Sequence, residues 1–263
     1  TFNGALYLEE QLMSIINQTY PIYEIIIQDD CSTDSSNIVF QMFEKRYTCI
    51  HVYRNETRKG INANFFSAMS RAKGDFIAIS DQDDIWELDK IENQMNSIQD
   101  NWLSSGFSKP FADNESIYFD NRIPNLNLER LIYIASSTPG HTLLFRKELL
   151  SKVPMMDFIL YDHLMTITAA ALGKLSFCNK ILVNHREHSS SATFTLPVMK
   201  RGKSTKNIKN IISSLLRTFI LYLKLHSKIR SYFIDMCCLL NEFPNQDCNV
   251  YAKKSSSHRT ITL

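Results

Sequence analysis

Segments with the pattern of buried strands alternate with segments of helical periodicity along the first half of the chain. Residues 24–28 (EIIIQ) crowd three isoleucines together without a helical period, whereas residues 7–18 place leucines and isoleucines on one face at helical spacing. Such alternation predicts an α/β fold with an open, largely parallel sheet. On the same grounds we expect strands at 24–28, 50–53, 75–80 and 142–145, an edge strand at 175–183, and helices at 7–18, 36–47, 64–72, 85–99 and from about 162, with a polar, irregular region at 100–127.

The composition is that of a globular protein. With 263 residues, of which 44% are hydrophobic, the chain can form one large α/β domain or two small ones. The six cysteines are scattered without a CxxC pair, which indicates reduced thiols in a cytosolic protein. No run of about 18 uncharged apolar residues occurs, so a membrane span is not expected. The chain begins at Thr1 rather than Met, and we expect that the natural N-terminus lies before it.

Two of the predicted strands end in carboxylates. EIIIQ leads into Asp29 and Asp30, and FIAIS leads into Asp81, Asp83 and Asp84. In open α/β sheets, ligands bind beyond the carboxyl ends of the strands, so both clusters point to one site. A divalent cation such as magnesium or manganese, together with ligand phosphates, would neutralise this concentration of negative charge.

These acids also have structural interpretations. Asp34 can cap the helix that follows the first strand, and Asp84 can lie in the first turn of the helix that carries Trp86, itself expected to be a core residue. Asp162 can cap the helix at 164–171. A phosphorylated receiver-like domain also gathers acids around magnesium, but it needs about half this length and a lysine after a later strand, for which no clear signal is present.

Several motifs, in order, carry a family resemblance. FNGALYLEEQLMSIINQTYPIYEIIIQDDCSTDSS at 2–36 and AKGDFIAISDQDDIWELDKIENQ at 72–94 are followed by GHTLLFRKELL at 140–150, ILYDHLMTITAAALGKL at 159–175 and HREH at 185–188. Together they resemble a family 2 glycosyltransferase of the GT-A fold. The resemblance covers about residues 1–190 and implies an α/β, Rossmann-like open mixed sheet flanked by helices. We therefore expect a catalytic domain at 1–195, whose first strand is missing ahead of Thr1. The composition of the remaining residues, 196–263, predicts a basic C-terminal helical extension and tail.

The resemblance also implies roles for individual residues. Asp30 resembles the residue that binds the uracil or thymine ring, Asp81 the acid near the ribose and diphosphate, and Asp83 the metal ligand. Asp162 resembles the general base that takes the proton of the acceptor hydroxyl, which would give inversion at the anomeric carbon. Arg186 and His188 match a segment that in this family approaches the diphosphate or metal, which assigns Arg186 to the nucleotide sugar and His188 to the metal, with a solvated loop histidine as the alternative for His188. Apart from the resemblance, Asn64 is a candidate for lining the nucleotide pocket, with a role in a solvated loop as the alternative. The cofactor implied is a divalent cation, manganese or magnesium.

Three departures from the family pattern bear on activity. Cys31 stands where the family usually has glycine in a turn, and a side chain tolerates a positive φ poorly. His163 follows the predicted base where an aromatic residue is more common, and the first strand is missing. The alternative to an enzyme is therefore a non-catalytic homologue that binds sugar nucleotides.

The C-terminal quarter is basic. Between Glu187 and Asp235 there is no acidic residue, while residues 207–240 combine many cations with apolar side chains. This composition predicts amphipathic helices that could hold a cytoplasmic enzyme at the inner face of the cell membrane, where a lipid-linked glycan acceptor would lie. The net charge of +2 and the lack of aromatic-basic interleaving argue against nucleic acid as a partner. The predicted donor is a UDP- or dTDP-linked sugar.

Overall fold

The computed structural model describes residues 1–112, 117–133, 138–153, 156 and 159–188, together with 234, 236 and 238–242. The chain divides into two compact units, Thr1–Arg186 and Glu187–Leu263. The first unit contains the helices and strands described below. The segment 207–240, for which amphipathic helices are predicted, lies almost entirely outside the described residues. Within the described part of the chain, no helix has the length and apolar character needed to cross a membrane.

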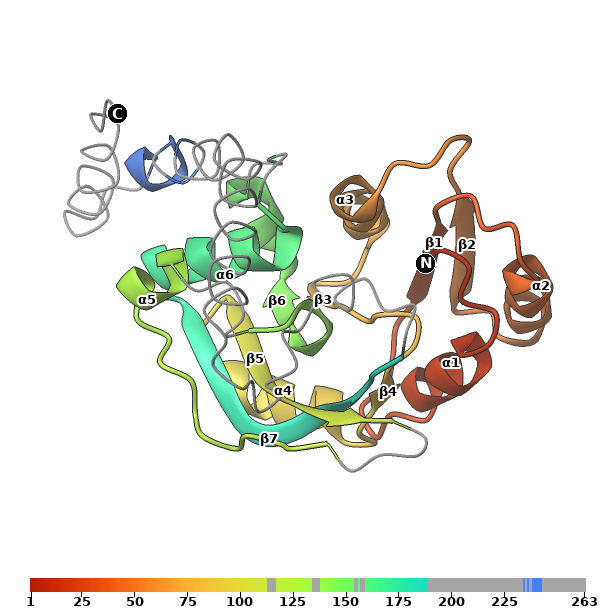
Figure 1. Cartoon of the computed structure of the whole chain (residues 1–263), viewed down its shortest axis with the longest axis horizontal. Coiled ribbons are helices and arrows are strands. Elements are labelled where there is room, and N and C mark those ends of the chain that lie inside the picture. The colour runs from red at the N-terminus through yellow and green to blue at the C-terminus, as the bar shows by residue number, and fades with distance from the viewer. Residues whose placement is uncertain are drawn as a thin grey trace, which may run out of the picture. The chain divides into compact units, whose positions relative to one another are not determined.

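The first part of this unit is a parallel pair of strands covered by helices. Strand β1 (Ile25–Asp29) pairs with β2 (Ile50–Arg54), and Ile25 lies opposite Ile50. Helices α1 (Leu8–Ile16) and α2 (Ser36–Arg46) lie on one side of the strands, and α3 (Ile61–Arg71) lies on the other (Figure 1). The helical periodicity explains this packing, because α1 buries Leu8, Leu12 and Ile15 on one face.

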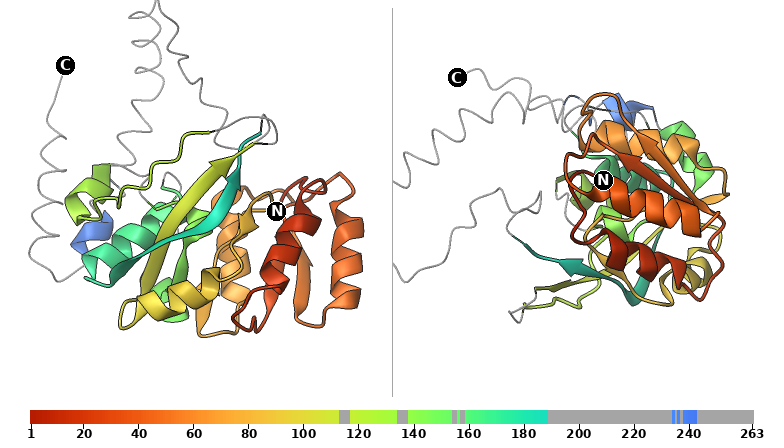
Figure 2. Two further views of the ribbon diagram at one scale, coloured as in Figure 1. Left: turned by 90° about the horizontal axis from the view of Figure 1, so that it is seen from below. Right: turned by 90° about the vertical axis from the view of Figure 1, so that its right-hand side faces the viewer.

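A second, five-stranded sheet has the order β3-β6-β5-β7-β4. Strands β5 and β7 are parallel and run side by side (Figure 2), whereas β3–β6, β5–β6 and β4–β7 are antiparallel. The predicted mixed sheet flanked by helices is thus confirmed, but the expectation of a largely parallel sheet is wrong for this half of the fold. The elements are β3 (Phe76–Ala78), β4 (Ile85–Trp86), α4 (Lys90–Ile98), β5 (Leu103–Phe111), α5 (Leu128–Tyr133), the 3-10 helix Gly140–Thr142, β6 (Leu144–Arg146), the 3-10 helix Lys147–Lys152, α6 (Tyr161–Ala171) and β7 (Leu175–Arg186).

The long strand β5 occupies part of the region that the sequence predicts to be irregular. Its first residues include Ser104, Ser105 and Gly106, which have little strand propensity, yet all three are buried. A Cβ added to Gly106 would come within 2.3 Å of Leu182, so the two strands approach too closely there for a side chain. Strand β5 therefore owes its structure to its neighbour β7, and not to a local pattern.

Two boundaries also differ from expectation. Strand β7 lies between β5 and β4, so it is not an edge strand. The helix expected at 85–99 begins only at Lys90, because Ile85 and Trp86 pair instead with Asn184 and Val183. Trp86 is buried in the core, as predicted. The later helix start has a direct consequence for Asp84, which cannot lie in the first helical turn.

Candidate active site

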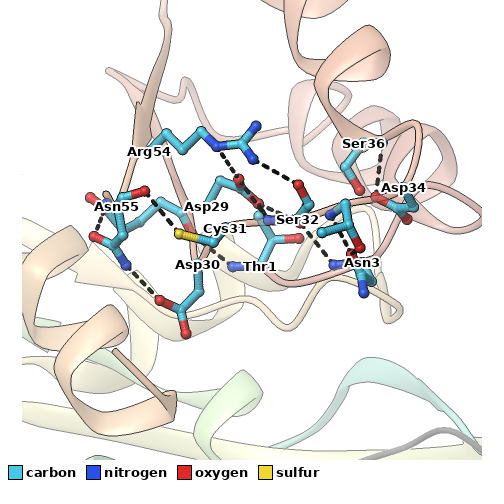
Figure 3. Close-up of polar contacts among 12 residues, drawn as sticks. Thr1, Asn3, Asp29, Asp30, Cys31, Ser32, Asp34, Ser36, Arg54 and Asn55 are labelled. Carbon is cyan, nitrogen blue, oxygen red and sulfur yellow. Dashed lines mark hydrogen bonds and ion pairs between the residues drawn. The ribbon is translucent and has the colours of Figure 1, made fainter. Parts of the chain in front are cut away.

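The carboxylate of Asp30, immediately after β1, is held by three protein donors. The backbone N–H of Lys59 and the side-chain amide of Asn55 both donate to Oδ1 at 2.7 Å, and the N–H of Gly60 donates to Oδ2 at 2.9 Å. Burial alone would raise the pKa of Asp30, but these hydrogen bonds outweigh burial and lower it. Asp30 is therefore ionised, and Figure 3 shows its side chain extending away from the turn that carries it.

Asp30 is connected through Asn55 to a buried network of side-chain amides formed by Gln28, Asn55 and Asn64. Asn55 donates to the side-chain oxygen of Asn64 at 2.8 Å, and Asn64 donates to the backbone oxygen of Gln28 at 3.0 Å. The side chain of Gln28 donates in turn to Asn55 at 2.9 Å. Asn64 thus has both its amide oxygen and its amide nitrogen engaged inside the protein, and its contact with a nucleotide sugar stays a prediction.

The turn after β1 is closed by side chains. Asp29 accepts hydrogen bonds from the N–H and the hydroxyl of Ser32, as a residue that supports the turn should (Figure 3). Cys31 has φ of 66°, the left-handed conformation that favours glycine. Its Sγ lies 3.0 Å from the backbone oxygen of Asn55, so the thiol contacts the same residue that holds Asp30.

Asp84 is fully buried and organises the second cluster. Its Oδ1 accepts the Nδ1–H of His185 at 2.9 Å and the backbone N–H of Arg186 at 3.0 Å, both from the end of β7. Its Oδ2 lies 3.2 Å from Nδ1 of His141. The helix-start role expected for Asp84 is wrong, because the chain here passes through β4 before α4 begins.

His141, which was not among the predicted site residues, joins this cluster. Its Nδ1 is 3.3 Å from Oδ2 of Asp81 and its Nε2 is 2.7 Å from Oγ of Ser108, while its ring stacks on that of His185 with centroids 4.8 Å apart. The pairing of β3 with β6 explains the meeting, because the residues after one antiparallel strand face those before the other. The signal for His141 in the sequence was its place in the GHTLLFRKELL motif, just ahead of the strand predicted at 142–145.

The carboxylates and imidazoles of this cluster shift each other's pKa values. Burial opposes ionisation of Asp81, but a hydrogen bond from His141 and the nearby imidazoles of His141 and His185 bring its pKa below the ordinary value. Burial likewise opposes protonation of His185, and the hydrogen bond and charge of Asp84 outweigh it, so the pKa of His185 is raised. The cluster therefore favours ionised carboxylates facing cationic or metal-bound partners.

The donor set fits a divalent cation. One atom each from Asp84, His141 and His185 lie within 4.8 Å of one another. Oδ2 of Asp84 is buried and, within the described residues, has no hydrogen-bond partner of acceptable geometry. Carboxylate oxygens suit magnesium and manganese, and imidazole nitrogens suit zinc, iron and related divalent metals. Asp83, the ligand implied by the family motif, is the half-buried residue beside Asp84.

His188, the other residue predicted to bind metal, is half-buried and lies in the second unit, beyond Arg186. Its role as a metal ligand stays a prediction.

Arg186 is buried and fastens the acid-rich segment to the rest of the unit. Its Nε donates to the backbone oxygen of Asp83 at 3.2 Å, and its Nη2 pairs with Glu10 of α1. Its guanidinium also lies over the rings of Tyr7 and Phe111. Arg186 thus connects the segment that carries Asp83 to helix α1. Its contact with a nucleotide sugar stays a prediction.

Asp162 is the second residue of α6, and its Oδ1 accepts the backbone N–H of His163 at 2.8 Å. Burial and the negative charge of Asp81 raise the pKa of Asp162, and the N–H of His163 only partly offsets them. Asp162 lies beside Gly140, since a Cβ added to Gly140 would be 3.3 Å from Cβ of Asp162, and the next residue, His141, contacts Asp81. A carboxyl with a raised pKa suits proton transfer.

The fold has counterparts among solved structures. The crystal structure of TarS 1–349 from S. aureus in complex with UDP-GlcNAc superposes with a TM-score of 0.60 at 18% identity, covering 98% of this chain and 89% of that one. The complex of TarS 1–349 with UDP gives a TM-score of 0.56 at 21% identity, covering 72% of this chain and 59% of that one. The mixed sheet and its flanking helices therefore define the GT-A class of fold.

The chain belongs to glycosyl transferase family 2, whose family model matches residues 1–155. It is 30% identical over 161 residues to the dTDP-rhamnosyl transferase RfbG of Shigella flexneri, over 57% of this chain and 54% of that protein. It is 32% identical over 104 residues to WfgD of Escherichia coli, a UDP-Glc:alpha-D-GlcNAc-diphosphoundecaprenol beta-1,3-glucosyltransferase, over 40% of each chain. The match thus spans about half the length of these curated relatives.

Proposed function

We propose that the chain is an inverting, cation-dependent glycosyltransferase that moves a sugar from a UDP- or dTDP-linked donor to a hydroxyl of a surface polysaccharide or a lipid-linked glycan. The observation that carries this proposal is that Asp162 lies beside Gly140, whose neighbour His141 contacts both Asp81 and Asp84 of the acid cluster. A transferase with a single displacement needs a proton acceptor on one side of the sugar and the diphosphate on the other.

Asp30 serves the donor base. Its carboxylate is ionised and held by three hydrogen bonds from the described residues, of which one, from the N–H of Gly60, goes to Oδ2. A carboxylate oxygen has room for a second donor, which the ring N–H of uracil or thymine supplies. Both bases carry this group at the same position, so Asp30 accommodates UDP- and dTDP-sugars alike. The relatives RfbG and WfgD are named for dTDP- and UDP-linked donors respectively.

Asp81, Asp83, Asp84, His141 and His185 serve the diphosphate side. Asp84 and the two histidines would hold a divalent cation, together with Asp83 as the family motif implies. When bound, such a cation stabilises the negative charge that develops on the leaving diphosphate. Asp84 and Arg186 keep this segment in place through contacts with the end of β7 and with α1.

Asp162 takes the proton of the acceptor hydroxyl as that oxygen attacks the anomeric carbon. Its raised pKa makes it a stronger base than an exposed aspartate, and its position at the start of α6 fixes the direction of its carboxylate. The basic segment 207–240 would hold the protein at the inner face of the membrane, where a lipid-linked acceptor lies. WfgD is named for an acceptor linked to diphosphoundecaprenol, which supports this class of acceptor.

The test is release of nucleoside diphosphate from UDP- and dTDP-sugars with manganese and a panel of glycan acceptors, for the wild type, Asp162→Asn and the exposed control Asp100→Asn. We expect turnover in the wild type and the control and a loss of at least about a hundredfold in Asp162→Asn, with donor binding retained. Donor binding without turnover under every condition would support the non-catalytic alternative. Turnover that survives in Asp162→Asn would show that another residue is the base.

A further inference from the structure

The start of helix α6, which carries Asp162, lacks a side-chain cap at its N-cap residue. The residue at the N-cap position is Leu160, whose apolar side chain cannot accept a hydrogen bond. The first backbone N–H groups of a helix have no partners within the helix, so they need acceptors from elsewhere. Asp162 itself provides one of these acceptors, for the N–H of His163.

Asn62 provides another from α3, almost a hundred residues earlier in the chain. Its Oδ1 accepts the backbone N–H of Tyr161, the first residue of α6, at 2.9 Å. Its Nδ2 donates to the backbone oxygen of Ile159 at 2.8 Å and to that of Met156 at 3.1 Å. One side chain thus ties down both the connection before α6 and the first turn of the helix.

Aromatic packing reinforces this joint. Phe65, one turn after Asn62 on α3, stacks on the ring of Tyr161 with centroids 4.2 Å apart and planes 24° apart. Tyr161 itself is buried. The two contacts hold the residue immediately before Asp162 from both its backbone and its side chain, so the position of Asp162 depends on α3.

The residues just before Asn62 also contact Asp30, the residue proposed to bind the donor's uracil or thymine ring. The N–H groups of Lys59 and Gly60 bind the carboxylate of Asp30, and Asn62 follows only two residues later. Residues 59–62 therefore contact both Asp30, which is proposed to bind the uracil or thymine ring, and helix α6, which carries Asp162, the proposed proton acceptor. A shift in this segment would move the two relative to each other.

We propose that Asn62 is a positioning residue. From helix α3 of the same chain it caps the start of α6 and so directs the carboxylate of Asp162 toward the acceptor hydroxyl. This inference rests on the proposed function of Asp162. Displacement of a catalytic group by about 1 Å can cost a hundredfold in rate, whereas the contacts of Asp30 with the donor base do not involve the Asn62 side chain. Loss of Asn62 should therefore reduce kcat and leave donor binding nearly unchanged.

The kinetic test compares Asn62→Ala with Asn37→Ala. Asn37 is the matched control, because it is the exposed second residue of α2 as Asn62 is the second residue of α3. We expect kcat to fall between about tenfold and a hundredfold in Asn62→Ala, while the affinity for UDP or dTDP stays within about twofold of the wild type and Asn37→Ala behaves as the wild type. An unchanged kcat would overturn the proposal, and so would a loss confined to donor affinity.

Hydrogen exchange of the whole protein provides a readout that does not need turnover. The N–H of Tyr161 should exchange faster in Asn62→Ala than in the wild type, and Asn62→Asp, which keeps the acceptor, should restore much of the protection. Equal exchange in all three proteins would refute the cap. If the wild type transfers no sugar, the proposed function fails by itself, and the exchange data still decide whether Asn62 holds the start of α6.

Discussion

The side-chain amide of Asn55 donates one hydrogen bond to Asp30 and another to Asn64, so it joins the acid at the end of β1 to the interior of the protein. Removing it should leave Asp30 with fewer of the hydrogen bonds that keep its carboxylate ionised and oriented. A hydrogen bond to a charged group contributes about 1.5–3 kcal/mol. We therefore expect Asn55→Ala to weaken UDP and dTDP binding by about tenfold or more, as measured by calorimetry. Affinity equal to that of the wild type would show that Asp30 does not depend on this network.

The histidine and carboxylate cluster predicts a specific loss of cation binding. His141→Ala removes one of the three grouped donors, whereas Lys45→Ala at an exposed position serves as the control. Titration of manganese followed by electron paramagnetic resonance should show weaker binding in His141→Ala by about tenfold or more, since the loss of one ligand removes a direct metal bond. Binding that is unchanged in His141→Ala but lost in Asp83→Asn would assign the cation to the motif acid without the histidine.

Lys90 is fully buried against the ring of Trp86, with Nζ 4.0 Å from the ring centroid and 2.9 Å from Oε1 of Gln94. Burial lowers the pKa of Lys90 from its ordinary value of 10.5 to about 7. Between these two pH values the unfolded chain binds more protons than the folded one, so this residue makes stability rise with pH. Below about pH 7 its full cost is present, and above about pH 10.5 the cost is relieved.

Lys90→Met should therefore flatten the dependence of unfolding free energy on pH. We expect its stability relative to the wild type to decrease from pH 7 to pH 10 by up to about 1.4 kcal/mol per pH unit, measured by urea denaturation at several pH values. The exposed Lys45→Met is the control and should run parallel to the wild type. If Lys90→Met also runs parallel, Lys90 titrates normally in the folded protein.

The positive φ of Cys31 predicts a stabilising substitution. A residue with a Cβ costs about 1–2 kcal/mol in the left-handed conformation, and glycine does not carry this cost. Cys31→Gly should raise the free energy of unfolding by about 1 kcal/mol, whereas Cys49→Gly, at a position without a positive φ, should lower it. Chemical denaturation measures both. A loss of stability in Cys31→Gly would mean that the contact of its thiol with Asn55 outweighs the strain.

Local patterns in the sequence were sufficient for much of the fold. The isoleucine-rich strands, the amphipathic helices α1 and α2 and the acids at the ends of β1 and β3 are all local features, because burial on one face imposes a fixed period. The strand β5 could not be predicted this way. Its serines and glycine carry no strand signal, and they form a strand only because β7 lies beside them.

The candidate site also combines residues that local patterns predict with contacts that only the tertiary structure creates. Asp30, Asp81 and Asp162 could be named from motifs, since each stands at the end of a strand or the start of a helix that the sequence itself predicts. The partners that set their charge and direction could not. His141 reaches Asp81 and Asp84 only through the antiparallel pairing of β3 with β6, and Asn62 reaches Tyr161 only because α3 packs against the start of α6. The sequence by itself thus determined which residue types could do the chemistry, whereas the tertiary structure alone decided their neighbours, because contacts between distant segments depend on how the whole chain packs and not on any local pattern.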